Sequence, residues 1–389
     1  MAWKVSCVMD ERKRFVEVWS QGEFSVAELC RQFGVSRKTG YKWLDRYRRR
    51  GWEGLEDLSR AAHGHPNEIA AELVERVVAF KGEHMLFGPK KIVARLRASE
   101  PDTVWPAVST AGDILKRAGL VVSRERRRRA TPSSAPLAHA DAPNALWCAD
   151  FKGWFRTRDG TCCIPLTISD ACTRYFLRCR AMTGHTGYAS VRPLFEAAFR
   201  EFGLPGRIRT DNGPPFASVG LAGLSRLSVW WMKLGIAPER IEPGHPEQNG
   251  RHERLHRTLK EATARPPAAT VRTQQGAFDR FLPYYNHERP HEALGQKTPA
   301  SIYTKSPRPY PARVPTTGDY PDPWTVRKVK DSGRLKWKGR ELHLSQALIG
   351  EYVGFEPVDD RRWVVHFLHQ PIALFDEHRL RFTPSKVNP

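Results

Sequence analysis

Residues 147–151, Trp147-Cys148-Ala149-Asp150-Phe151, place one aspartate inside an otherwise apolar run that is typical of a β-strand. Removing a carboxylate from water is costly unless the carboxylate is paired with a cation or binds a metal ion. The strand itself offers Asp150 no such partner. We therefore take Asp150 as the first candidate site residue and build the interpretation of the chain around it.

Two further acids stand where predicted elements meet turns. Asp211 follows a short strand predicted at residues 207–210 and begins the turn Asp211-Asn212-Gly213-Pro214-Pro215, and sites collect at strand ends in open sheets. Glu253 lies on a helix predicted at residues 249–264. Carboxylates that converge from different elements can hold two Mg²⁺ or Mn²⁺ ions about 3.5–4 Å apart, the arrangement for in-line displacement at phosphorus.

The composition indicates a polyanionic partner. The chain has 63 Lys and Arg against 42 Asp and Glu, a formal net charge of +21, and such an excess is typical of proteins that bind nucleic acid. Its 7 cysteines form no CxxC pair and no Cys/His set with zinc-ligand spacing, which indicates reduced thiols. Because there is no long apolar run and no signal-peptide start, we expect a cytoplasmic protein without membrane contact.

The helix predicted at residues 249–264 places an acid and several bases on one face. Glu253, His256, Arg257 and Lys260 are three, four and seven residues apart, so they share that face. We predict that double-stranded DNA is contacted by Lys260, Arg257, His256 and Asn249. For the histidines at 245, 252 and 256, the absence of cysteine partners favours DNA contacts or surface positions over a zinc site.

Three blocks of the chain resemble the catalytic core of retroviral integrases and of bacterial insertion-sequence transposases. They are Trp147-x-x-Asp150, Thr210-Asp211-Asn212-Gly213-x-x-Phe216 and His245-Pro246-x-x-Asn249-Gly250-x-x-Glu253-x6-Lys260. A fourth block, Tyr285-Asn286-x3-Arg289-Pro290-His291-x2-Leu294-x3-Thr298-Pro299-x3-Tyr303, resembles the segment that follows this core in the bacterial branch.

The resemblance covers about residues 145–305 and implies an α/β RNase H-like core. It implies that Asp150, Asp211 and Glu253 are the catalytic acids and bind Mg²⁺ or Mn²⁺, two ions per active site. It also implies a homo-oligomer, a dimer or higher, that holds two DNA ends together. Zinc-binding residues like those at the amino terminus of retroviral integrases are lacking, and helix-turn-helix units stand in their place.

Two other acids compete for places in the site. Glu247 precedes Gly250, whereas the glutamate of the family falls three residues after the matching glycine, which selects Glu253. Asp170 ends a predicted strand, and we interpret it as an acid with a turn or packing role rather than as a metal ligand.

The sequence pattern of the predicted core contains both strand-like and helical segments. Strand-like runs at residues 147–154, 162–169 and 174–179, with Asp159-Gly160 between the first two, predict an antiparallel start. A helix at residues 188–202 and the strand at 207–210 complete an α/β layout.

The amino-terminal residues 10–51 predict three helices in a helix-turn-helix arrangement. Ser25-Val26-Ala27-Glu28 is a capping-box pattern, Gly34 suits the tight turn, and Ser36 can cap the third helix. That helix, residues 36–50, would read DNA. Its predicted DNA contacts are Arg37, Lys38, Lys42 and Arg46.

Apolar residues at helical spacing between 69 and 96, and a helix capped by Ser109, predict a second helix-turn-helix or winged helix. Five short strand patterns near the carboxyl end predict a small all-β SH3-like barrel. They lie at residues 324–329, 334–337, 352–357, 363–368 and 372–375.

We therefore expect a multidomain chain. Its predicted parts are a helix-turn-helix domain (1–58), a second helix-turn-helix or winged-helix-like domain (66–122), a basic Pro/Ala/Ser linker (123–144), the RNase H-like core (145–305), a Pro-rich linker (306–323) and the small β-barrel (324–384).

The function that these patterns favour is that of a transposase that binds the terminal inverted repeats of an insertion sequence, cleaves DNA and transfers strands to target DNA. Two alternatives stay open: a catalytically inactive DNA-binding regulator derived from such an enzyme, and an RNase H-like nuclease that cuts without joining. The presence of all three acids and Lys260 counts against the regulator.

Overall fold

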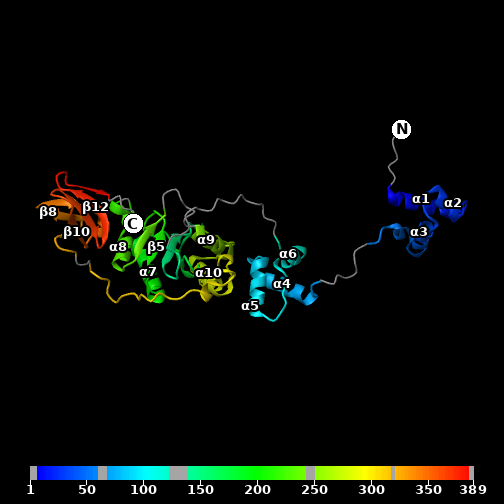
Figure 1. Ribbon diagram of the computed structural model, residues 1–389, viewed down its shortest axis with the longest axis horizontal. Coiled ribbons are helices and arrows are strands. Elements are labelled where there is room, and N and C mark those ends of the chain that lie inside the picture. Colours follow the sequence, from blue (N-terminus) through cyan, green and yellow to red (C-terminus); the bar gives the residue numbers. More distant parts are fainter. Residues whose placement is uncertain are drawn as a thin grey trace, which may run out of the picture. The chain divides into compact units, whose positions relative to one another are not determined.

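The computed structural model describes residues 7–59, 68–121, 139–218, 220–241, 250–316 and 320–384. The chain divides into two units, Met1–Ala70 and Ala71–Pro389, whose elements are labelled in Figure 1. Within the described ranges, no helix has the length and apolar character needed to cross a membrane.

The first unit is the predicted three-helix arrangement. Its elements are α1 (Val8–Ser20), α2 (Val26–Gln32), α3 (Arg37–Arg50) and the 3-10 helix η1 (Gly51–Leu55). The Ser25 capping box is confirmed, because its side chain accepts from the Glu28 N–H and Glu28 bonds back to the Ser25 N–H. Ser36 caps α3, and Gly34 turns the chain at φ +64°, a conformation that glycine adopts without strain.

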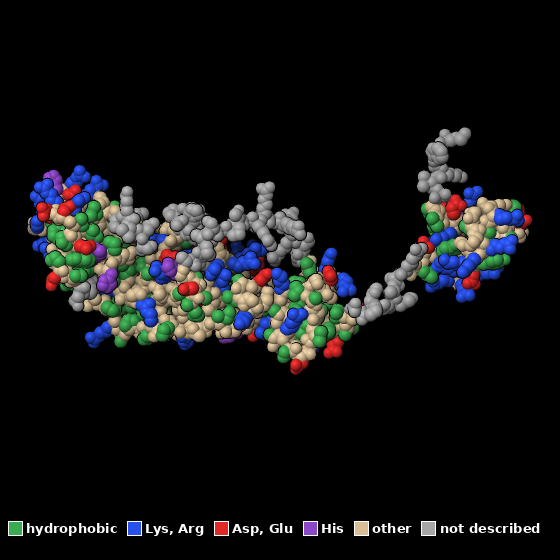
Figure 2. Space-filling view, viewed as in Figure 1, with side chains coloured by type: hydrophobic (Ala, Val, Ile, Leu, Met, Phe, Trp, Pro, Cys, Tyr) green, Lys and Arg blue, Asp and Glu red, His purple; other side chains and the backbone are tan. Residues whose placement is uncertain are grey.

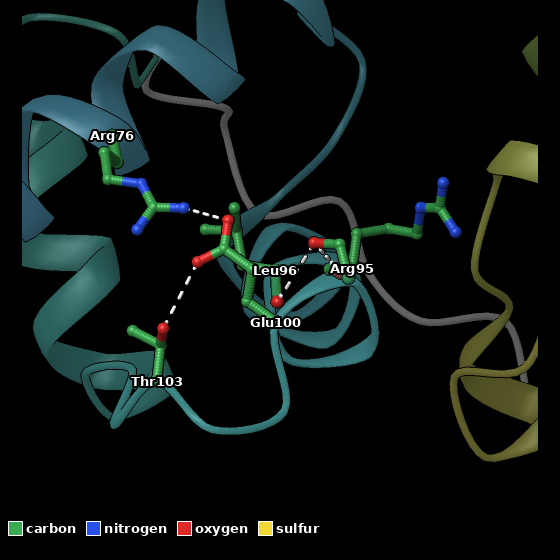
Figure 3. Close-up of polar contacts among 6 residues, drawn as sticks. Arg76, Arg95, Leu96, Glu100 and Thr103 are labelled. Carbon is green, nitrogen blue, oxygen red and sulfur yellow. Dashed lines mark hydrogen bonds and ion pairs between the residues drawn. The ribbon is translucent and has the colours of Figure 1, made fainter.

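The next three helices are α4 (Ala71–Glu83), α5 (Pro89–Ser99) and α6 (Val108–Arg117). Ala107, not Ser109, is the N-cap of α6, so the Ser109 cap prediction is wrong. Glu100, which follows α5, pairs with Arg76 of α4 and accepts a 3.2 Å bond from the Thr103 hydroxyl (Figure 3). Between residues 68 and 121 the structure contains no strand, which favours the helical alternative over a winged helix.

The part of the chain between residues 145 and 305 is built on a mixed sheet. Three antiparallel strands, β1, β3 and β4, are extended by β5 and β6, which run parallel to β1. β2 pairs with the start of β3. This arrangement is RNase H-like. The strands are β1 (Leu146–Phe151), β2 (Phe155–Arg156), β3 (Cys162–Asp170), β4 (Phe176–Met182), β5 (Arg207–Thr210) and β6 (Ala237–Arg240).

The predicted hairpin and the helix at residues 188–202 are confirmed, with two differences. Gly153, at φ +75°, turns the chain after β1, so the first predicted strand ends at residue 151 rather than 154, and β2 follows it as a separate short strand. Helix α8 and strand β6, which the sequence interpretation missed, follow the Asp211 turn. The helices of the core are α7 (Tyr188–Phe202), α8 (Arg226–Lys233), α9 (Gly250–Thr263) and α10 (Val271–Pro283).

Apolar clusters on the two faces of the sheet fix these helices. One cluster joins Trp147 and Ile208 to Phe199 of α7 and Trp231 of α8. The other joins β3 and β4 residues to α9 and α10, and it buries Cys163 and Cys179 as small apolar side chains. Successive strand residues point to opposite faces, which is why a single strand supplies both clusters.

A buried polar network ties the end of β3 to the start of β1. Asp170 is fully buried and accepts 2.7 Å bonds from the N–H groups of Asn144 and Thr173. The Asn144 side chain in turn accepts from the indole of Trp147 at 3.0 Å and from the hydroxyl of Tyr303 at 2.8 Å. Asp170 therefore has the predicted turn role, and the Tyr303 end of the fourth sequence block serves to close the core.

Short helical segments follow α10. They are η4 (Tyr284–Glu288), η5 (Glu292–Leu294) and η6 (Pro299–Ser301), with η2 (Leu221–Gly223) and η7 (Gln346–Leu348) elsewhere. Buried Asn286 of η4 bonds to both the N–H and the C=O of Phe176, at 2.8 and 2.9 Å, and so completes β4 in the manner of a neighbouring strand.

The carboxyl-terminal strands do not form the predicted closed barrel. They make a five-stranded antiparallel meander in the order β13-β12-β11-β10-β7, with the hairpin β8–β9 as a separate two-stranded sheet. The hairpin covers one face of the meander, where Trp337 contacts Phe355 and Phe375. The strands are β7 (Thr325–Lys328), β8 (Arg334–Trp337), β9 (Arg340–His343), β10 (Tyr352–Pro357), β11 (Arg362–Phe367), β12 (Gln370–Asp376) and β13 (Arg381–Pro384).

The first prediction concerns the Asp170 network. Asp170→Ala leaves the buried N–H groups of Asn144 and Thr173 without acceptors, so we expect the free energy of unfolding to fall by about 2–4 kcal/mol. Thermal unfolding followed by near-ultraviolet circular dichroism measures the change. The exposed Asp141, replaced by Ala, is the matched control and should leave the transition in place. Equal transitions in the two variants would show that the network contributes little.

Candidate active site

Strand register brings Asp150 and Asp211 side by side. β1 pairs with β5 in parallel, with Leu146 opposite Arg207 and Cys148 opposite Arg209. Continuing that register by two residues aligns Asp150, at the end of β1, with Asp211, which directly follows β5. Neighbouring strands lie about 4.8 Å apart, so the two carboxylates share one edge of the sheet. Glu253 lies in the first turn of α9 and is exposed.

The acids oppose one another's ionisation. Burial, together with the charges of Asp211 and Glu253, raises the pKa of Asp150 to about 7, although a bond from the Phe151 N–H acts in the opposite direction. Burial also raises the pKa of Asp211, although the Gly213 N–H donates to its carboxylate at 3.2 Å. Like charges in a partly desolvated place are stabilised by a cation between them.

The donor chemistry of this place suits a divalent metal ion. Three carboxylates supply the oxygen ligands that Mg²⁺ and Mn²⁺ prefer, and Asp211 and Glu253 both lie close enough to raise the pKa of Asp150. Among the described residues, no three His, Cys, Asp or Glu side chains are arranged to hold one ion. Mutual repulsion keeps uncompensated carboxylates apart, and a cation would draw them together.

Two histidines of α9 lie inside the protein and anchor the helix to the sheet. His252 and His256 both bond through Nε2 to the hydroxyl of Thr167, each at 2.7 Å. That hydroxyl donates to the Asp150 carbonyl at 3.1 Å. When the Thr167 proton is on the Asp150 carbonyl, the hydroxyl oxygen accepts from both imidazoles, each protonated on Nε2. Ser169 can then donate to Nδ1 of His252, at 2.9 Å.

These positions correct the sequence interpretation of the histidines. His252 and His256 are only 1% and 6% exposed, so neither is a surface residue, and the predicted DNA contact of His256 does not fit its position. Burial lowers their pKa to about 3 and about 2, which keeps both neutral. The sequence interpretation missed Thr167 and Ser169. The signal that could have found them is their pattern, because they are two polar residues, two positions apart, in the otherwise apolar run of β3.

The other face of α9 is exposed and basic. Arg257 and Lys260 lie on it with Glu253, and Arg257 also pairs with Glu261 at 3.1 Å. Lys152, which the interpretation missed, joins this group from the β1 end. Burial and then the charge of Lys260 lower the pKa of Lys152, while Asp150 and Glu253 raise it. Asn249, His245 and Glu247 lie outside the described residues.

The predicted reading helix is exposed as DNA contact requires. Arg37, Lys38 and Lys42 of α3 are exposed and Arg46 is half-buried. Lys42 and Arg46 each lie within 5 Å of the buried Trp43 ring, at 4.9 and 4.8 Å from its centre. Lys and Arg side chains cover much of the visible surface of this unit (Figure 2). Whether these residues contact DNA stays a prediction.

Comparison with known families gives five matches along the chain. The Integrase core domain matches residues 140–246 and, in a second family model, residues 234–299. A Helix-turn-helix domain matches residues 11–63 and a Homeodomain-like domain residues 39–115. The IS481 family transposase, C-terminal domain matches residues 324–380.

Relatives with similar sequences come from insertion elements. The IS476 uncharacterized 39.2 kDa protein of Xanthomonas euvesicatoria is 29% identical over 64% of this chain and 70% of the relative. The IS407 uncharacterized 31.7 kDa protein of Burkholderia multivorans is 27% identical over 62% of this chain and 83% of the relative. A simian T-cell lymphotropic virus intasome chain aligns with 77% of this chain and 98% of its own length, at 18% identity and a TM-score of 0.37.

The raised pKa of Asp150 predicts a pH-dependent stability. Its folded pKa of about 7 lies above the ordinary 3.8, so the folded chain binds this proton more tightly, and stability is lost as pH rises from about 4 through 7. The Asp150→Asn variant has no carboxyl group to ionise at this position, so it does not lose this part of its stability as pH rises. In metal-free buffer the variant should match the wild type near pH 4 and be about 1–3 kcal/mol more stable at pH 8, as measured by chemical unfolding.

Addition of Mg²⁺ at pH 8 supplies the control. The ion should stabilise the wild type and reduce or reverse the difference, because a ligand that binds the folded state raises its stability. A difference that is independent of pH, or equal stabilisation of both chains by Mg²⁺, would contradict the account of Asp150.

Proposed function

This chain belongs to the insertion-sequence transposases of the DDE and retroviral-integrase superfamily, and we propose that it cleaves DNA at the ends of an insertion sequence and transfers the strands to target DNA. The single observation that carries this proposal is the meeting of Asp150 and Asp211 at one sheet edge, with Glu253 near enough to raise the pKa of Asp150.

In this proposal Asp150, Asp211 and Glu253 hold Mg²⁺ or Mn²⁺, two ions per site. Such ions activate a water or 3′-hydroxyl for attack and stabilise the leaving oxygen. The protein's own part is positioning. The His252–Thr167–His256 network holds α9, and with it Glu253, against β3. Lys260 and Arg257 bind backbone phosphates from the exposed face of the same helix.

The helical regions supply the DNA binding. Helix α3 would enter the major groove of a terminal inverted repeat, with Arg37, Lys38, Lys42 and Arg46 on phosphates and base edges. The formal charge of +21 supports such binding across the chain. A dimer or higher oligomer on DNA would bring two ends together, in the bacterial cytoplasm.

Purified full-length protein with Mg²⁺ and labelled element ends separates the transposase from its alternatives. We expect cleaved ends and joined product on a target duplex. Shifted but uncut DNA would support a DNA-binding regulator, and cleavage without joined product would support a nuclease.

Replacement of a single site acid should stop the chemistry and spare DNA binding. Glu253→Gln is expected to lower the cleavage rate by roughly 10²–10⁴-fold, because the loss of metal-assisted stabilisation is worth several kcal/mol. Glu261→Gln, on the same helix two turns on, is the matched control and should retain activity. Gel-shift affinity for the ends should be equal in both. Comparable cleavage by the two variants would exclude Glu253 from the site.

A further inference from the structure

We propose that a hollow beside the three acids binds one unstacked nucleobase of the DNA end, next to the reacting phosphate, with Trp154 as its stacking surface. This inference rests on the proposed function, because it takes the polymer at the acids to be DNA. It adds a base-binding subsite to a site otherwise built for phosphates and metal ions.

The hollow lies between the β1–β2 loop and α9. Its floor is apolar and includes Phe155, Leu259 and Phe278, and its rim carries Lys152 and Lys260. The space that its walls enclose holds little more than one water molecule, so a flat ring would lie across its mouth, against Trp154, rather than inside it. An apolar floor with a cationic rim suits a flat, weakly polar ring joined to negatively charged groups.

Trp154 lines the same hollow and stays 66% exposed. The loop that presents it is anchored, because the Lys152 N–H donates to the Pro165 carbonyl at 2.8 Å, and Gly153 then turns the chain at φ +75°. The guanidinium of Arg156 lies 5.9 Å from the indole centre. Scattered exposed apolar residues are ordinary, but this indole stands on a fixed loop between two lysines.

The position of the hollow relative to the three acids indicates that a nucleobase binds there. Lys152 lies close enough to Lys260, Asp150 and Glu253 for their charges to shift its pKa, so a phosphate held at the acids would lie near the cationic rim of the hollow. The base attached to that phosphate or to its neighbour can then reach the hollow. Aromatic side chains that stack on single bases tolerate any base, because every base has a π-face.

A double-mutant cycle that combines a substitution of Trp154 with the removal of one base from the DNA tests this proposal. Affinity of full-length protein for element ends is measured by fluorescence anisotropy in Ca²⁺, with each nucleotide beside the cleaved bond replaced in turn by an abasic residue. For the wild type, removal of one particular base should weaken binding about 5- to 100-fold. For Trp154→Ala, removal of the same base should have no further effect.

Two variants keep the result decisive. Trp154→Phe retains an aromatic face and should restore most of the dependence on that base. Tyr352→Ala, which removes an exposed aromatic side chain of the carboxyl-terminal sheet, should behave as the wild type. If the protein cuts and joins ends but no base shows coupling to Trp154, the subsite is wrong and the transposase function stands. If the wild type fails to bind element ends, both proposals fall.

Discussion

One electrostatic constraint governs the candidate site: the carboxylate of Asp150 lies where burial and two neighbouring acids oppose its ionisation. The β1–β5 register sets Asp211 beside it, and α9 brings Glu253 near. A protein gains no stability from such an arrangement in the absence of a cation. A divalent cation between the acids, as we propose, would offset this cost.

The histidines of α9 attach this helix to the sheet without placing a positive charge beside the acids. A helix that carries Glu253 must be held close to β3, but a lysine or arginine at the interface would neutralise the acids and weaken their attraction for a metal ion. His252 and His256 are buried and neutral, and they share the Thr167 hydroxyl. They bind the helix in place without adding charge. The basic groups Arg257 and Lys260 are kept on the exposed face, where phosphates would lie.

Local signals predicted much of the fold. The Ser25 capping box, the Asp159-Gly160 hairpin and the helix at residues 188–202 are set by neighbouring residues, and the structure has them. The rest depends on distant contacts. The burial of His256 depends on Thr167, which is far away in sequence, and the open carboxyl-terminal sheet depends on where its edge strands stop pairing. The three acids could be chosen from sequence blocks, whereas Lys152 and Trp154 emerged only from the hollow that they line.

The central claim is that Asp150, Asp211 and Glu253 bind divalent cations on DNA. Anomalous scattering from Mn²⁺ in crystals of the full chain with an element end tests it most directly. The account predicts Mn²⁺ peaks coordinated by oxygens of Asp150 and Asp211, with Glu253 completing the site, at metal–oxygen distances of about 2.0–2.3 Å. Acids that remain apart with DNA and Mn²⁺ present, or Mn²⁺ bound only elsewhere, would contradict it.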